Sequence, residues 1–397
     1  MNFIFAIMAY YPDHAGGAWM YANGLAEELV KQGHKVDVIV PRQDDKLTDN
    51  STLNGVTIHR LPSHNKINPN FFEKWSRDNK ELVRFIKDQP FDKDSVFINH
   101  QAYMGKGFLK WKGPRTAAIF HGPWDEEFLL AKSLKTQPTL KKVILRGAAK
   151  WMRGVEKKSL YHAKTIFTAS NYAANKFLQT HPRIDHPIVN ISAGTDYERF
   201  KKVEIHQTNN FKEKFKIDSD HFLIGSVRRL DKRMGLDMLI DGFNIACKSF
   251  TNLRLIIAGK GPQFSELKEK IDKLNLSNKA TLAGFISDED LATFYSSCDL
   301  TVMPSIDLEG FGLSTIESLG CGTPVIASNS GANLETVSPL DENLIFEKGN
   351  AQDIAKKIIQ FVSGEKPMPS EESCRQYALH SFSWKKSAQK LVSHFLS

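Results

Sequence analysis

Several features that would define whole classes of protein are missing from this sequence. None of its apolar runs approaches the roughly 18 residues that a membrane-spanning helix needs. The apolar start, residues 1–12, lacks a basic leader and runs into a turn, so we expect a buried first strand and no signal peptide. The four cysteines, Cys247, Cys298, Cys321 and Cys374, are scattered without metal-ligand or CxxC spacing. They indicate reduced core thiols of a cytoplasmic protein.

A dinucleotide-binding fingerprint is also missing. The stretch "PDHAGGAW" follows the first apolar run and contains Gly16 and Gly17, but no G-x-G-x-x-G follows a strand. Paired glycines at the start of a helix let backbone N–H groups approach an anion such as a diphosphate. The alternative is a tight strand–helix turn. A nicotinamide-dependent oxidoreductase is therefore disfavoured.

The chain contains enough apolar sequence for two globular domains. It has 397 residues, of which 41% are hydrophobic and 25% are charged. The formal net charge of +8 favours acidic partners, such as phosphorylated ligands, anionic lipid headgroups or nucleic acid. The charge alone does not choose among these partners.

Short apolar runs alternate with helical patterns along both halves of the chain. This alternation predicts an α/β fold of two doubly wound, mostly parallel domains, with a linker near residue 200. We expect a first domain over 1–200, a second over 201–375, and a helix over 376–397 that packs back on the first domain. In such folds ligands bind beyond the carboxyl ends of the strands, so two facing domains would make a cleft.

Polar residues follow several of the predicted strands. His121 lies in the turn "FHGPW", where a structural or solvated histidine is the alternative to a functional one. Asp125, Glu126 and Glu127 are expected to form a solvated first helical turn. The loop "GSVRRLDKRMG" contains a cluster of cations that either neutralises a diphosphate or forms a solvated basic turn; it comprises Arg228, Arg229, Lys232 and Arg233.

Three further segments have two interpretations each. Gly259 in "AGKGP" supplies a backbone contact or a plain turn, and Phe285 with Ile286 faces a flat base or ends a buried strand. Residues 130–163 carry one acid, Glu156, against nine Lys and Arg residues, which suits an anionic membrane surface or the polar face of a surface helix. The segment "IDSD" at 217–220 is typical of a turn, and we do not expect a metal site there.

Two glutamates, Glu309 and Glu317, stand eight positions apart in "EGFGLSTIESLGCGTPVIAS". If a helix begins near Gly312, its inward stripe includes Ile316 and Gly320, and Glu317 falls on that stripe. A buried carboxylate needs a partner. The partner is either a structural donor or a bound ligand.

The chain resembles the retaining glycosyltransferases of family 4 over essentially its whole length. The resemblance rests on the order of "PDHAGGAW", "HGPW", "TASNYAANKF", "ISAGTDYERF", "RRLDKRMGLDMLI", "AGKGP" and "EGFGLSTIES", with Glu309 and Glu317 matching the family's E-x7-E signature. It implies the GT-B fold, in which two Rossmann-like domains enclose the active site. One departure is Met234, where many members carry a lysine; Arg233 or Lys232 must then supply the second charge beside Arg229.

The resemblance also implies roles for individual residues. Glu309 would bind hydroxyls of the donor sugar, Glu317 would bind the ribose, and His121 would lie near the sugar. The predicted catalytic residues are Glu309, Arg229, Arg233 and His121. The predicted donor-binding residues are Gly16, Gly17, Arg228, Lys232, Gly259, Phe285, Ile286, Phe311, Gly312, Leu313, Ser314 and Glu317.

The predicted reaction moves a hexose or N-acetylhexosamine from a nucleotide diphosphate sugar, preferably a UDP-sugar, to a hydroxyl acceptor. We expect the reaction to retain the anomeric configuration and to need no metal or cofactor. The family resemblance implies that the leaving phosphate accepts the acceptor's proton, so no protein base is required. We expect a role in surface polysaccharide or glycoconjugate synthesis, without nucleic acid, in the cytoplasm or at the inner membrane face through segment 130–163. The alternative is a non-catalytic nucleotide-sugar-binding subunit of a glycosyltransferase complex.

Overall fold

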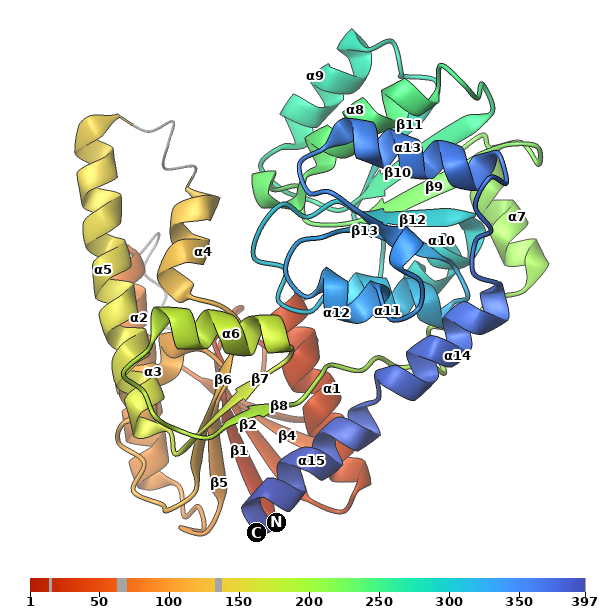
Figure 1. Ribbon diagram of the computed structural model, residues 1–397. Coiled ribbons are helices and arrows are strands. Elements are labelled where there is room, and N and C mark those ends of the chain that lie inside the picture. The colour runs from red at the N-terminus through yellow and green to blue at the C-terminus, as the bar shows by residue number, and fades with distance from the viewer. Residues whose placement is uncertain (14–15, 63–69, 133–137, 397) are drawn as a thin grey trace. The chain divides into compact units, whose positions relative to one another are not determined.

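The computed structural model describes residues 1–13, 16–62, 70–132 and 138–396 (Figure 1). The chain forms two compact units. Unit 1 comprises Met1–Gly194 together with Trp384–Ser397, and unit 2 comprises Thr195–Ser383. The chain therefore passes between the units at Gly194/Thr195 and at Ser383/Trp384. The sequence had predicted these boundaries near residues 200 and 375.

Unit 1 contains an eight-stranded sheet in the order β3-β4-β2-β1-β5-β6-β7-β8. All neighbouring strands are parallel except β3, which runs antiparallel to β4. Sequence patterning missed β3 because its residues, "NSTL", are polar and it lies at the sheet edge. Asn54 and Gly55, with φ of 49° and 82°, form the tight turn that joins it to β4. The strands are β1 Asn2–Ala6, β2 Lys35–Pro41, β3 Asn50–Leu53, β4 Val56–Leu61, β5 Val96–Asn99, β6 Thr116–Phe120, β7 Thr165–Thr168 and β8 Ile188–Asn190.

The helices of unit 1 cover this sheet. α1 buries Tyr21, Ala22, Leu25 and Leu29, and the chain turns away from the helix at Gly33, whose φ is 83°. Among the described residues, no helix combines the length and the apolar character that a membrane crossing requires. The helices are α1 Gly17–Lys31, α2 Phe71–Asp88, α3 Gly105–Phe108, α4 Trp124–Ala131, α5 Thr139–His162, α6 Asn171–Thr180 and α15 Trp384–Leu396.

The helix expected over 376–397 is divided between the units. α14, Glu371–Ser381, belongs to unit 2, whereas α15 packs along α1 in unit 1 (Figure 1). The indole of Trp384 occupies the space beside Gly24, where an added Cβ would lie 2.3 Å from the ring. Farther along α15, the Thr165 hydroxyl and the His394 Nε2 are hydrogen bonded at 2.8 Å. This last helix therefore completes the first unit.

Unit 2 contains a six-stranded parallel sheet in the order β11-β10-β9-β12-β13-β14. The stretch after residue 200, which looked like a polar linker, folds as α7 and packs Phe211 and Phe215 against the core. The strands are β9 Phe222–Val227, β10 Leu253–Ala258, β11 Ala280–Gly284, β12 Leu300–Met303, β13 Val325–Ser328 and β14 Ile345–Phe346. The helices are α7 Ile205–Lys214, α8 Leu236–Ala246, α9 Phe264–Lys273, α10 Leu291–Ser297, α11 Leu313–Gly320, α12 Asn333–Val337, α13 Ala351–Val362 and α14.

Candidate functional site

In unit 2, a buried ion pair forms where two central strands end. β9 leads directly into Arg228, and the neighbouring β12 leads into the loop that carries Glu309. The Nη1 of Arg228 lies 3.2 Å from Oε2 of Glu309, and both side chains are less than 10% exposed. Ser305 Oγ donates a hydrogen bond of 2.7 Å to the same carboxylate oxygen. Parallel neighbours end at the same sheet edge, which explains why residues 81 positions apart in the sequence meet here.

Two glycines fix the loops that hold this ion pair. At Gly235, whose φ is 65°, an added Cβ would lie 2.0 Å from the carbonyl oxygen of Pro304. At Gly331, whose φ is 59°, it would lie 2.3 Å from the carbonyl oxygen of Glu309. That same carbonyl accepts a hydrogen bond from the amide of Ala332 at 2.9 Å. Both the left-handed conformation and the close backbone contact therefore require glycine.

Arg228 retains unused hydrogen-bonding capacity. Its Nη1 also donates to Ser314 Oγ at 3.3 Å, at the first turn of α11. Its Nε and Nη2 are buried and have no hydrogen-bond acceptor among the described residues. Because a buried N–H without an acceptor is costly, these two groups indicate a place for an oxygen atom that the chain itself does not supply.

In α11 the predicted inward residues Ile316 and Gly320 are buried, whereas Glu317 is half-buried at the margin of that side. The helix begins after Gly312, whose φ is 88°. Tyr295 OH donates a hydrogen bond of 2.9 Å to Glu317 Oε2, which is a structural partner for this carboxylate. Burial of the carboxyl group raises the pKa of Glu317 to about 7, although the Tyr295 hydrogen bond and the positive charge of Arg199 act against the increase. Sequence reasoning missed Tyr295 because it faces Glu317 from a different helix, α10.

The other cations of the β9 loop occupy different environments. Arg229 and Lys232 are exposed. Arg233 is half-buried, and its Nη1 donates to the carbonyl oxygen of Leu308 at 3.1 Å. The buried Met234 directs its sulfur toward Ser305, 3.9 Å from the hydroxyl that contacts Glu309. Arg228, to which the sequence assigned only a binding role, is thus the cation of the loop that contacts Glu309.

The remaining predicted residues of unit 2 lie around the ends of β10 and β11 and beside α11. Phe285 is 58% exposed, with the Lys260 ammonium 5.1 Å from its ring centroid, while Ile286 is half-buried. The amide of Gly259 donates to the carbonyl oxygen of Gly284 at 2.7 Å, so it joins the two loops. Phe311 packs its ring against Phe382, at 5.6 Å between centroids. The Phe285 ring, directly after β11, is therefore largely exposed to solvent.

In unit 1, two histidines follow neighbouring strands. His121 comes after β6 and His100 after β5, with their rings stacked 6.4 Å apart. Burial lowers the pKa of His121 to about 4 and that of His100 well below its usual value, so both rings are neutral near pH 7. Within the described ranges, His121 Nε2 and both ring nitrogens of His100 have no hydrogen-bond partner. His100 was not predicted as a site residue, although its position after the strand in "INHQ" is a signal.

The paired glycines differ in their surroundings. Gly16 precedes α1, and an added Cβ there would lie 2.7 Å from the Trp19 ring, whereas a Cβ on Gly17 would meet nothing within 4 Å. Another atom can therefore approach the backbone of Gly17 closely. The two residues before Gly16 lie outside the described residues.

The acidic residues at the start of α4 and those at 217–220 lie in different environments. The expectation that Asp125 is solvated is wrong: it is 4% exposed and lies 2.6 Å from Arg153, because α5 packs beside α4. Asp218, Asp220 and His221 bring their polar atoms within 4.8 Å of one another. The His221 Nδ1 accepts from the amide of Asp218 at 2.8 Å, and both aspartates are exposed, which suits a turn.

Comparison with known sequences covers most of the chain. Residues 15–199 match the family described as Glycosyltransferase Family 4, and residues 207–380 match Glycosyl transferases group 1. An uncharacterized glycosyltransferase of Methanocaldococcus jannaschii is 25% identical over 83% of this chain and 80% of its own length. Alpha-monoglucosyldiacylglycerol synthase of Streptococcus pneumoniae is 24% identical over 85% of this chain and 72% of its own length.

Solved structures show the same fold. Sucrose-phosphate synthase from Thermosynechococcus elongatus aligns with a TM-score of 0.78 at 21% identity, over 99% of this chain and 98% of that one. HepE of Anabaena, solved in complex with UDP and glucose, aligns with a TM-score of 0.76 at 15% identity, over 100% and 99% of the two chains. These likenesses confirm the predicted GT-B class with two doubly wound α/β units.

Proposed function

Because the chain belongs to the group 1, family 4 glycosyltransferases, we propose that it transfers a hexose or N-acetylhexosamine from a nucleotide diphosphate sugar to a hydroxyl acceptor. We propose retention at the anomeric carbon, no requirement for a metal ion, and UDP as the preferred carrier. The HepE complex with UDP and glucose supports this carrier. The glucosylated lipid in the name of the Streptococcus pneumoniae relative supports a role in glycolipid or surface-glycan synthesis.

The observation that carries the proposal is the buried Arg228–Glu309 pair with two guanidinium N–H groups left over. The unused Nε and Nη2 suit the oxygens of a diphosphate, and the backbone N–H groups at the start of α11 lie beside the same side chain through Ser314. Fixed positive groups of this kind stabilise the negative charge that develops on a leaving diphosphate. Arg229 and Arg233 add further positive charge from the same loop.

The two carboxylates have separable roles in this proposal. Glu309, held by Ser305 and Arg228, accepts hydrogen bonds from hydroxyls of the donor sugar. Glu317, held by Tyr295, accepts from the ribose hydroxyls. The exposed ring of Phe285 stacks on the base.

Proton transfer in this mechanism needs no protein base. The acceptor hydroxyl attacks from the face that the diphosphate leaves, and the phosphate oxygen takes its proton. His121 is neutral, which suits a hydrogen-bonding role and not that of a charged acid. Gly17 and His121 keep the donor-contact roles that the family resemblance implies.

The first test identifies the donor by thermal stabilisation in the presence of a metal chelator. The ligands are UDP, GDP, ADP, UDP-glucose, UDP-N-acetylglucosamine, GDP-mannose and NAD. A ligand that binds only the folded protein raises its melting temperature. Stabilisation by one nucleotide and its sugar conjugate would support metal-free donor binding, whereas stabilisation by NAD alone would overturn the proposal.

The second test separates catalysis from binding. We expect Glu309→Gln to lower kcat by about 10²-fold or more with nucleotide binding retained, and Arg228→Met to weaken nucleotide binding as well, because its charge faces the leaving group. Arg254→Met is the control, because this half-buried arginine donates to the carbonyl oxygen of Leu253, on β10. Unchanged turnover in Glu309→Gln would contradict the catalytic role. Nucleotide binding without turnover in the unmodified chain would indicate the non-catalytic subunit.

A further inference from the structure

The first half of α5 presents large apolar side chains to solvent. Leu140 is 76% exposed, Val143 is 62% exposed and Ile144 is 63% exposed. The opposite side of the helix is buried in unit 1, through Leu145 and Ala149. An ordinary surface helix has its polar residues on the outer face, so this pattern is inverted over the first turns of α5.

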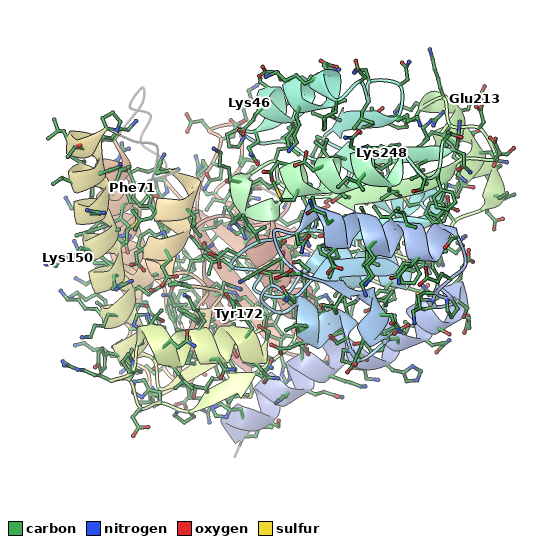
Figure 2. All side chains as sticks on the ribbon, turned by 45° about the horizontal axis from the view of Figure 1, so that its top comes forward. Lys46, Phe71, Lys150, Tyr172, Glu213 and Lys248 are labelled. Carbon is green, nitrogen blue, oxygen red and sulfur yellow. The ribbon has the colours of Figure 1, made fainter. Side chains whose placement is uncertain are left out.

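The apolar surface continues onto the start of α2. Trp151 lies seven residues after Ile144, which is about two helical turns and therefore the same side of α5. Its ring packs 4.8 Å from that of Phe72 and 6.3 Å from that of Phe71. Phe71 and Phe72 are 41% and 46% exposed. Phe71 is labelled in Figure 2. The two helices thus form one continuous patch.

The described part of the chain leaves this face of α5 uncovered. Gly147 lies between Ile144 and Trp151, and an added Cβ there would meet nothing within 4 Å. The same is true of Gly154, about two turns further along. Contiguous exposed apolar surface of this kind marks an interaction site.

The exposed charged side chains of α5 around the patch are all positive. Lys141, Arg146 and Lys150 are exposed among the apolar residues, and Lys150 points away from the helix into solvent (Figure 2). The single acid of the helix, Glu156, is buried and lies 3.2 Å from the His181 ring. A partner for this face must therefore combine an apolar layer with negative charge.

We propose that this face docks on an anionic lipid bilayer. The docking face consists of Leu140, Val143, Ile144, Phe71 and Phe72, with Lys141, Arg146 and Lys150. Apolar side chains insert at the boundary between headgroups and acyl chains, while lysine and arginine remain among the anionic headgroups. A bilayer with anionic headgroups offers an apolar layer and negative charge together, whereas a second copy of this basic face would repel the first. This inference stands independently of the transfer reaction.

Vesicle flotation tests the proposal with the full chain. Vesicles of phosphatidylcholine alone are compared with vesicles that also contain phosphatidylglycerol, at low and at physiological salt. We expect binding to the anionic vesicles only, weakened by salt because the headgroup attraction is screened. Equal binding to both kinds of vesicle, or to neither, would overturn the proposal.

Two triple variants divide the apolar and ionic contributions. Leu140→Ser/Val143→Ser/Ile144→Ser and Lys141→Gln/Arg146→Gln/Lys150→Gln should each reduce vesicle binding by about tenfold or more. The controls are Ile205→Ser, at a side chain 73% exposed on α7, and Lys46→Gln/Lys248→Gln/Lys348→Gln, which removes the same charge elsewhere. Lys46 and Lys248 are labelled in Figure 2.

The controls should bind as the unmodified chain does, and all variants should keep their melting temperature because every altered side chain is largely exposed. Loss of binding in the charge control to the same degree would show that net charge, and not this face, attracts the vesicles. A dimer in size-exclusion chromatography that the serine variant dissociates would assign the face to a second copy and overturn the proposal. Loss of vesicle binding with nucleotide stabilisation intact would separate this result from the proposed transfer.

Discussion

Glu317 shows how one residue can lower the stability of the folded chain. Its pKa rises from an ordinary value near 4.5 to about 7 on folding, because its carboxyl group is buried. The folded state therefore holds a proton that the unfolded state loses. Between these two pKa values, stability falls as pH rises, and above about 7 the full penalty is present.

We expect Glu317→Gln to stabilise the ligand-free chain more at pH 8 than at pH 5. The neutral amide keeps an acceptor for Tyr295 OH and avoids the buried charge. The difference should be on the order of 1–3 kcal/mol, which is the scale of a shift of two pKa units. Urea denaturation at both pH values measures it. An equal effect of the substitution at pH 5 and pH 8 would mean that the carboxyl group is ionised at both.

At this scale the sequence predicted the residues that follow strands. Arg228 and His121 follow strands of parallel sheets, so their position singled them out, whereas Glu309 was predicted from its spacing to Glu317 and from the family signature. Ser305 and Tyr295 could not be found in this way, because their importance depends on which helix or loop faces the carboxylates. Which of the four cations of the β9 loop reaches Glu309 also depends on packing, and sequence patterning cannot order them.

At the scale of elements, α5 combines a packed inner side with an open outer side that contains two glycines. Glycine in a helix interior costs about 0.5–1 kcal/mol relative to alanine. Because a Cβ at Gly147 or Gly154 meets no neighbour, Gly147→Ala/Gly154→Ala should stabilise unit 1 by about 1–2 kcal/mol. Thermal unfolding measures the shift.

The matched control is Gly242→Ala in α8. There an added Cβ would lie 2.8 Å from the carbonyl oxygen of Ala351 and from Ile354, so we expect destabilisation. Destabilisation by the α5 substitutions as well would mean that another surface covers that face in the folded protein.

Periodicity predicted the strongly patterned elements and missed the polar ones. α1 begins and ends close to its predicted positions, and α11 begins where it was predicted to, because glycines mark these helix boundaries. β3 is held by backbone pairing at a sheet edge, and α7 is anchored by Phe211 and by Phe215, the residue directly after the helix. Elements of this kind leave little trace in an apolar pattern. Asp125 was misjudged because its burial comes from α5, not from its own helix.

At the scale of the whole molecule, the alternation of strands and helices was sufficient to predict two doubly wound units. It did not fix where the last helix begins. Trp384 makes an edge-to-face contact with Tyr21 at 5.2 Å and fills the space beside Gly24, so unit 1 depends on a segment from the far end of the sequence.

We therefore expect Trp384→Ala to destabilise unit 1 by about 2 kcal/mol or more, and unit 2 much less. Limited proteolysis followed by mass spectrometry measures the effect in each unit, with cleavage expected to increase within residues 1–194. Leu396→Ala, at a side chain 71% exposed, is the control. Increased cleavage confined to residues 195–383 would contradict the assignment of α15 to unit 1.

The position of α15 also sets an order of events during synthesis. The ribosome delivers residues 1–194 first, but the surface of α1 around Gly24 stays bare until Trp384 and the rest of α15 emerge. Unit 2 has all of its residues earlier, because they form one uninterrupted segment. We expect the unit whose synthesis begins first to mature last, with a stretch of apolar surface open to chaperones in the interval.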